Sequence, residues 1–217
     1  DTRPDGIPKR AYRYIEAPKG SNLYWDLPQI AAAFEADRLF GAGRWAGAAE
    51  EYVAAFLERS RATNGIFLWG NHYYYDAFID RTVRFGQTPQ PVDFQTEEGE
   101  LHEMRPLPPA WDAVAQVSAE AVEKEIAVAS ARHLSDPVVG EFNRHATPEK
   151  DCDFIEAGGI LVESLAWLYR RTSDPALLDR ARRIAHYSYS HRDRKTGLME
   201  VKPAYARWDK FNATTEV

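Results

Sequence analysis

The sequence predicts an all-α protein built from helical hairpins in series. Apolar residues recur at helical spacing in several separate segments, whereas the alternation typical of strands is scarce. The segments follow a repeated order of helix, short turn, helix and long polar loop. Hairpins joined in this way favour a ring of helices whose long loops gather at one rim.

The first hairpin is expected from two amphipathic segments. Residues 27–40 carry apolar side chains on one face, with Asp26 as the N-cap and Pro28 in the first turn, where proline is tolerated. Gly41 begins a glycine-rich turn, since glycine is common just after a helix. Residues 44–59 repeat the helical pattern and complete the hairpin.

Three further helices are predicted along the chain, over residues 109–133, 151–171 and 177–191. The second of these contains Gly158 and Gly159, and each glycine inside a helix costs about 1 kcal/mol relative to alanine. This cost indicates either a kink or the close approach of another element. His133 and His186 lie on helices and are interpreted as structural or surface groups.

The polar loops hold the groups that suggest a functional site. Residues 68–76 combine aromatic rings, an imidazole, an amide and a carboxylate with no clean period, which favours a loop that lines a site. The alternative is an aromatic plug that closes the helical core. Residues 86–109 form a second long loop, and a third irregular stretch covers residues 141–145.

Composition and charge limit the classes of function. We expect an irregular arm over residues 1–22 and one helical domain over residues 23–217, incomplete at its C-terminus because only about five helices are visible. The net charge of −6 argues against nucleic-acid binding, and no apolar run approaches the roughly 18 residues that a membrane span needs. A single cysteine, Cys152, excludes an internal disulfide and a cysteine-based zinc site.

Residues 174–185 and the turn at residues 194–198 resemble the repeating hairpin of (α/α) toroid carbohydrate-active enzymes, barrels of six or seven hairpins, of which only part would be present here. The order of the loop residues His72, Glu103 and the pair Arg144-His145 is similar to that of family 2 polysaccharide lyases, the pectate lyases on this fold.

The resemblance implies a site and a reaction. His72, Glu103 and His145 would bind a divalent transition metal, and Arg144 would act as the base in β-elimination on a pectate-like uronic-acid polymer. Two imidazoles and one carboxylate suit a metal such as manganese better than calcium. His102 could replace Glu103 or join it. An acidic polysaccharide or oligosaccharide is the expected partner, with a secreted or periplasmic location.

Other assignments remain open for the catalytic groups. A guanidinium holds its proton strongly, which makes Arg144 an awkward base, and Tyr73, Tyr74 or Tyr75 is the rival acid or base. Asn71, His72 and Tyr73 together also suggest a lyase arrangement that uses no metal. Residues able to stack on sugar rings or bind substrate carboxylates are Trp69, Tyr75, Arg105, Arg207 and Trp208.

Two rival functions also fit the sequence. A glycoside hydrolase on the same toroid would need two carboxylates that flank the scissile bond, for which the candidates are Asp76, Asp80, Glu141 and Glu156. A non-catalytic glycan-binding helical protein would use the loops for recognition alone.

Overall fold

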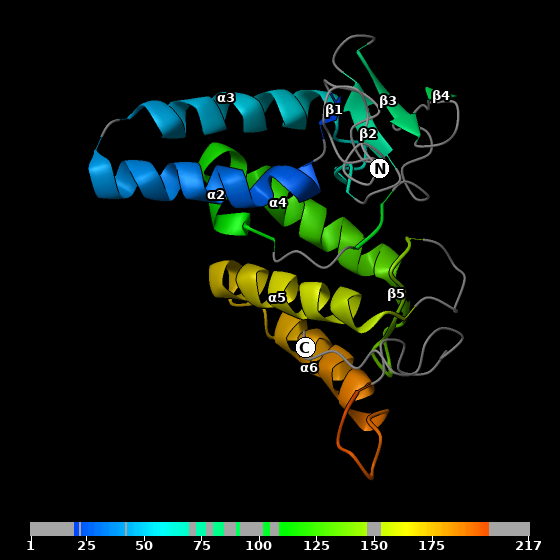
Figure 1. Cartoon of the computed structure of the whole chain (residues 1–217). Coiled ribbons are helices and arrows are strands. Elements are labelled where there is room, and N and C mark those ends of the chain that lie inside the picture. Colours follow the sequence, from blue (N-terminus) through cyan, green and yellow to red (C-terminus); the bar gives the residue numbers. More distant parts are fainter. Residues whose placement is uncertain are drawn as a thin grey trace, which may run out of the picture.

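The computed structural model describes residues 20–21, 23–41, 43–69, 73–76, 80–84, 90–91, 102–104, 109–146 and 153–199. Most of the expected N-terminal arm lies outside these residues. Figure 1 shows the described part as helices with short strands at one end. The helices are α2 (Leu23–Phe40), α3 (Arg44–Arg59), α4 (Trp111–His133), α5 (Ile155–Thr172) and α6 (Pro175–Ser190).

The first hairpin, α2 and α3, confirms the prediction from helical spacing. Helix α3 has the predicted bounds, but α2 begins at Leu23, so that Asp26 lies in its first turn and is not the N-cap. The Asp26 carboxylate instead accepts a 2.5 Å hydrogen bond from the Tyr52 hydroxyl, which joins the two helices. The apolar face of α3, including Val53 and Phe56, is buried in the core.

Helix α4 lies between the two hairpins and packs on both α3 and α5. Two tryptophans fix its contact with α5: Trp111 Nε1 donates to Ser164 Oγ at 2.9 Å, and Trp167 Nε1 donates to Asp112 Oδ1 at 2.8 Å. Ser118 interrupts the helical backbone, so α4 is kinked near its start. The helix therefore contributes to two core clusters, one under each hairpin.

The second hairpin consists of α5 and α6. Asp174 caps α6 by accepting a 2.9 Å hydrogen bond from the Ala176 amide, and Pro175 occupies the first turn, so the helix begins two residues before its predicted start. A side chain at Gly158 would meet the Phe142 ring at 2.6 Å. The glycine therefore permits a close approach, as its position inside a helix had indicated.

The strands were not predicted from the sequence. Four of them, β1 (Gly20–Ser21), β2 (Tyr73–Asp76), β3 (Arg81–Arg84) and β4 (Gln90–Pro91), form an antiparallel sheet in that order. A smaller sheet joins β5 (Leu134–Asp136) to β6 (Glu141–Phe142). Residues 73–76, expected to be a loop, are therefore a strand, in which Tyr74 and Tyr75 are buried.

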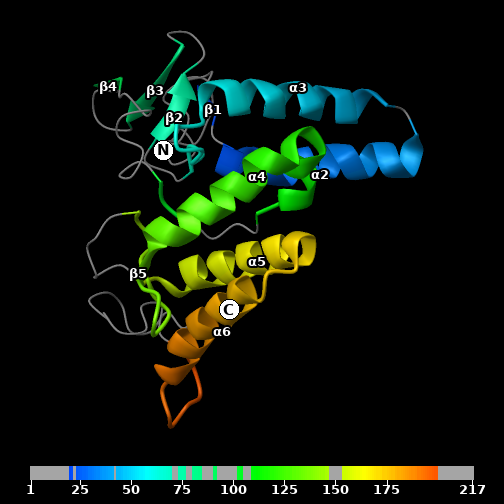
Figure 2. The ribbon, with the colours of Figure 1, turned by 180° about the vertical axis from the view of Figure 1, so that it is seen from behind.

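Both sheets lie at the same end of the helices, opposite the turn between α2 and α3. Figures 1 and 2, which view the molecule from opposite sides, agree on this arrangement. The described strands thus lie at one end, which agrees with the prediction that the long connections lie on one side of the helices. The described helices form two hairpins around a central helix, and within this part of the chain they do not close into a ring.

Candidate functional site

Two loop segments meet at the end of the helices that carries the strands. Glu103 and His145 form an isolated antiparallel bridge between them. The Met104 amide donates to the Arg144 carbonyl at 2.9 Å, and the Ala146 amide donates to the His102 carbonyl at 3.1 Å. These backbone bonds set the register of residues 102–104 against residues 144–146.

The bridge brings together three of the residues proposed for the metal and the base. The Glu103 side chain is 4% exposed, and its Oε1 atom lies 3.0 Å from His145 Nε2 and 3.3 Å from Arg144 Nε. His145 is the most accessible of the three, with 31% of its side chain exposed. One carboxylate oxygen therefore contacts both an imidazole and a guanidinium, which come from a loop about 40 residues away in sequence.

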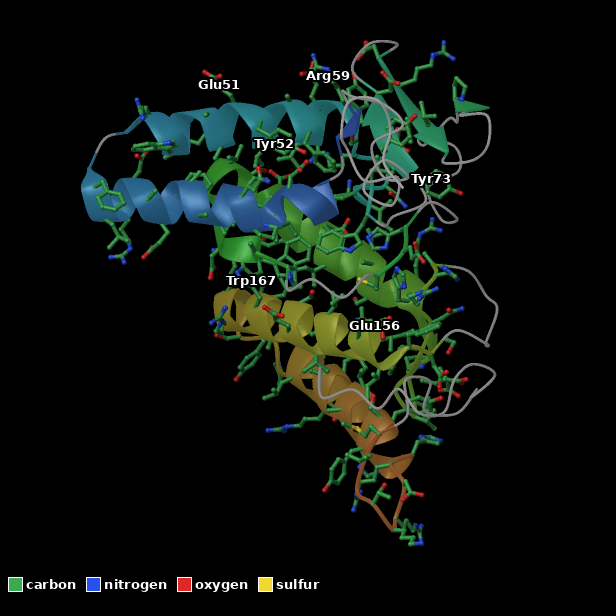
Figure 3. All side chains as sticks on the ribbon, viewed as in Figure 1. Glu51, Tyr52, Arg59, Tyr73, Glu156 and Trp167 are labelled. Atoms are coloured by element: carbon green, nitrogen blue, oxygen red, sulfur yellow. The ribbon has the colours of Figure 1, made fainter. Side chains whose placement is uncertain are left out.

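The surroundings of Arg144 favour its positive charge. Its guanidinium lies 3.9 Å from Glu156 Oε1 as well as close to Glu103, and its Cζ atom is 3.9 Å from the centre of the Phe154 ring. Neighbouring carboxylates and an aromatic face both stabilise a cation. Figure 3 shows Glu156 at the start of α5, at the same end of the molecule as Tyr73 on β2.

The chemistry of the donors fits part of a metal site. His145 and Glu103 supply an imidazole nitrogen and a carboxylate oxygen, which suit a divalent transition metal, and their 3.0 Å separation is close to that of two neighbouring ligands on one ion with bonds of about 2.1 Å. Among the described residues no group of three such ligands occurs. His72, the third predicted ligand, lies outside the described residues, as does Asn71.

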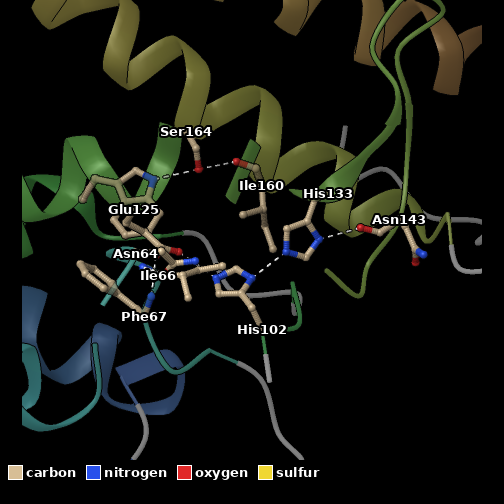
Figure 4. Close-up of polar contacts among 10 residues, drawn as sticks. Asn64, Ile66, Phe67, His102, Glu125, His133, Asn143, Ile160 and Ser164 are labelled. Atoms are coloured by element: carbon tan, nitrogen blue, oxygen red, sulfur yellow. Dashed lines mark hydrogen bonds and ion pairs between the residues drawn. The ribbon is translucent and has the colours of Figure 1, made fainter. Parts of the chain in front are cut away.

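A buried polar chain includes the residues that directly precede Glu103 and Arg144 in the sequence, and Figure 4 shows its members. His102 Nε2 lies 2.8 Å from Glu125 Oε1, and His102 Nδ1 lies 2.6 Å from His133 Nε2. His133 Nδ1 is 2.7 Å from the Asn143 carbonyl, and Glu125 Oε2 accepts a 2.6 Å hydrogen bond from the Phe67 amide. The three titratable side chains are at most 1% exposed.

Burial sets the charge of this chain. Loss of water raises the pKa of Glu125 to about 8, although the hydrogen bond from the Phe67 amide opposes the rise. Burial lowers the pKa of His102 to about 3, and it also holds the pKa of His133 well below its usual value. The contact between His102 and Glu125 is therefore a hydrogen bond between neutral groups at neutral pH, although its distance would also suit an ion pair.

Glu125 was not among the residues predicted for the site, and His133 was predicted to have only a structural or surface role. A signal was available, because both occupy positions on the apolar stripe of α4 formed by Val122, Ile126 and Ala129. A carboxylate and an imidazole on a buried face need polar partners, which here come from other loops.

Residues 35–156, more than half of the chain, match the family model described as periplasmic pectate lyase. The chain belongs to this pectate lyase family. The matched region includes the Glu103–His145 bridge, Arg144, and every residue of the buried polar chain. The resemblance inferred from the order of the loop residues is thus confirmed at the level of the family, and the family in turn implies an (α/α) toroid.

The other residues predicted to contact substrate or to act in catalysis lie in different surroundings. Trp69 is 1% exposed and packs on Trp111 at 5.4 Å between ring centres, and Tyr75 is 8% exposed. Their burial favours the aromatic-core interpretation over stacking on a sugar. Tyr73 is half-buried on β2. Three other candidates lie outside the described residues: Arg105, Arg207 and Trp208.

The carboxylates proposed for a hydrolase are dispersed over several elements. Asp76 ends β2, Asp80 lies in the following turn, Glu141 begins β6, and Glu156 lies in the first turn of α5 beside Arg144. None of the described helices is long and apolar enough to cross a membrane. The clearest convergence of chemically distinct groups in the described part of the chain is therefore that of Glu103, Arg144 and His145.

Proposed function

We propose that the chain acts in β-elimination on a uronic-acid polymer such as pectate, with a divalent transition metal bound by His72, Glu103 and His145. The observation that carries this proposal is the sharing of one Glu103 oxygen by His145 and Arg144. It supports the family's chemistry because it places the two proposed metal ligands, Glu103 and His145, in contact with the positively charged Arg144 within the matched region. The family description also supports a periplasmic location.

The reaction removes a proton from C5 of a uronate, forms a double bond between C4 and C5, and breaks the bond from C4 to the leaving oxygen, which takes up a proton. A bound metal would supply Lewis-acid neutralisation of the substrate carboxylate, which makes the C5 proton more acidic. Glu103 and His145 would hold that ion from opposite strands of the bridge, with His72 as the third ligand.

We propose that Arg144 lies next to C5 of the bound uronate, beside the proposed metal ligands Glu103 and His145. Its fixed position between Glu103, Glu156 and the Phe154 ring orients the guanidinium before substrate arrives. Removal of the C5 proton by this group requires a guanidinium that has lost its own proton, so Tyr73 remains the rival base. Asn71, Arg105, Arg207 and Trp208 are proposed to contact the substrate.

The direct test is the ultraviolet absorbance of the unsaturated uronate product. The full chain would be incubated with polygalacturonate before and after treatment with EDTA, and again after addition of Mn²⁺ or Ni²⁺. We expect absorbance that rises, stops with EDTA and returns with metal. New reducing ends without this absorbance would indicate a hydrolase, and no product from any uronic-acid polymer would favour glycan binding alone.

Matched variants tie the activity to the bridge. Glu103→Gln and His145→Ala should each lower activity and Mn²⁺ affinity by about 100-fold or more, because each removes a proposed ligand. Glu120→Gln and His186→Ala change the same residue types at exposed helical positions and should leave both quantities unchanged. Equal loss in the control variants would refute the assignment of the ligands.

The two candidate bases are separated by their own variants. If Arg144 removes the proton, Arg144→Met abolishes turnover, whereas Tyr73→Phe retains most of it. The opposite result would assign the proton transfer to Tyr73. The Mn²⁺ affinity of both variants, measured separately by calorimetry, shows whether a loss of turnover follows from a loss of metal.

A further inference from the structure

We propose that the buried chain Glu125–His102–His133 is a positioning device for the candidate site, in which the three side chains fix the two loop segments that carry Glu103 and Arg144-His145. This inference rests on the proposed function and adds three residues to the site that contact neither metal nor substrate. Its essential feature is a continuous series of hydrogen bonds from the Phe67 amide to the Asn143 carbonyl (Figure 4).

The carbonyl at one end of the chain fixes the direction of every hydrogen bond in it. The Asn143 carbonyl can only accept, so His133 Nδ1 donates and, in the neutral ring, His133 Nε2 accepts. His102 Nδ1 must then donate to His133, which leaves His102 Nε2 as an acceptor. Glu125 Oε1 consequently donates, as a protonated carboxyl, while its Oε2 accepts from the Phe67 amide. Every polar atom in the series has its matching partner.

Two members of this series, His102 and Asn143, are each one residue away from the site. His102 precedes Glu103 in the segment that forms the bridge, and successive residues of an extended segment point to opposite sides. Holding the His102 ring in the core therefore fixes the direction of the Glu103 carboxylate. On the other strand, the hydrogen bond to the Asn143 carbonyl holds the backbone directly before Arg144 and His145.

Helix α4 is the rigid element to which both loops are tied. Glu125 and His133 both project from its buried face, so His102 and Asn143 are held against one helix. The Asn143 amide also donates to the His133 carbonyl at 2.8 Å, which gives that loop a second bond to the end of α4. Loop residues supported in this manner keep the geometry that a metal site requires.

The test uses variants that keep or remove the hydrogen-bond pattern of Glu125. Glutamine at this position donates to His102 Nε2 and accepts from the Phe67 amide, as the protonated carboxyl does, so Glu125→Gln should keep the Mn²⁺ affinity and kcat close to those of the unmodified chain. Glu125→Leu can do neither, and should lower both quantities by about 10-fold or more at a temperature where the variant remains folded.

A control separates positioning from general stability. Ser164→Ala removes a buried hydrogen bond between α4 and α5, formed with Trp111, and should lower Tm while the Mn²⁺ affinity and kcat remain unchanged. If Glu125→Leu also lowers Tm without changing Mn²⁺ affinity or kcat, the positioning role is overturned. The same conclusion follows if Glu125→Gln is as defective as Glu125→Leu.

Hydrogen exchange gives a readout that depends on neither metal nor turnover. The amides of Met104 and Ala146 bridge the two segments and should exchange at least about 10-fold faster in Glu125→Leu than in Ser164→Ala. Rapid exchange of both amides in the unmodified chain would overturn the proposal even if Glu125→Leu fails to fold. A chain without lyase activity or Mn²⁺ binding would refute the proposed function, whereas amide exchange would still decide the positioning role.

Discussion

Stability should fall with rising pH between pH 6.5 and pH 8, and the fall should depend on Glu125. Burial raises the pKa of this carboxyl from 4.5 to about 8. Between these values the folded chain holds one proton that the unfolded chain has released, so the free energy of unfolding decreases as pH rises. Below the unfolded value both states are protonated and the contribution is complete.

The two neighbouring histidines set the window for this measurement. Burial lowers the pKa of both His102 and His133, so their contribution to stability is lost as pH falls below their usual value of 6.5. Above pH 6.5 both rings are neutral in the folded chain, and the slope that remains from their deprotonation in the unfolded chain is the same in Glu125→Gln, so it cancels when the two proteins are compared. Over the remaining 1.5 pH units, at about 1.4 kcal/mol per unit, Glu125 accounts for a loss of about 2 kcal/mol.

Urea denaturation followed by tryptophan fluorescence at several pH values from 6.5 to 8 would measure this slope. Glu125→Gln has no titrating group at this position, so the difference in unfolding free energy between it and the unmodified chain should change by about 2 kcal/mol over the window. Glu120→Gln, on the exposed side of the same helix, should follow the unmodified chain at every pH. Parallel curves for the unmodified chain and Glu125→Gln would show that Glu125 is already ionised in the folded state.

Three other predictions concern the helices that support the site. Gly158→Ala should lower the unfolding free energy by about 1–3 kcal/mol in urea denaturation, because its methyl group would meet the Phe142 ring at 2.6 Å; a neutral result would contradict that close approach. Gly47→Ala, in α3 with open space around it, should instead raise stability by up to about 1 kcal/mol, and a loss would mean that the position is crowded. Asp174→Ala should lower Tm through the loss of about 1 kcal/mol of capping at α6, whereas Asp174→Asn should retain most of the cap.

The helices were predictable because the spacing of apolar residues within each segment shows which face of the helix is buried. The bounds of α3 follow from an apolar stripe that ends in glycine on one side and a loop on the other, and only local residues are needed to see it. The sheet was not predictable in this way. Residues 73–76 form a strand whose three successive tyrosines show no alternation, because Tyr74 and Tyr75 are both buried. Their pairing with β3 becomes visible only when the chain has folded.

The candidate site shows the same division between local and long-range information. The order of Glu103 and Arg144-His145 along the chain indicated the family, and the structure brings these side chains into contact. Glu125 carries no motif that the chain order reveals. Its partners lie 23 and 58 residues away, so the need for them could be inferred from its place on an apolar stripe, but their identity could not.

The buried polar chain also specifies the register of the bridge. A slip of one residue in the segment 102–104 would exchange the sides on which His102 and Glu103 project. The Glu103 carboxylate would then face Glu125 in the core, without the His102 imidazole between them. The two carboxyl groups and His133 would lack the hydrogen-bond partners that His102 supplies. Each buried polar atom left without a partner costs about 1–3 kcal/mol, so the observed register is strongly favoured. A fully paired polar chain thus specifies the register, which an apolar contact could not do. Val or Leu at position 102 would bury its side chain without requiring a particular hydrogen-bond donor or acceptor opposite it.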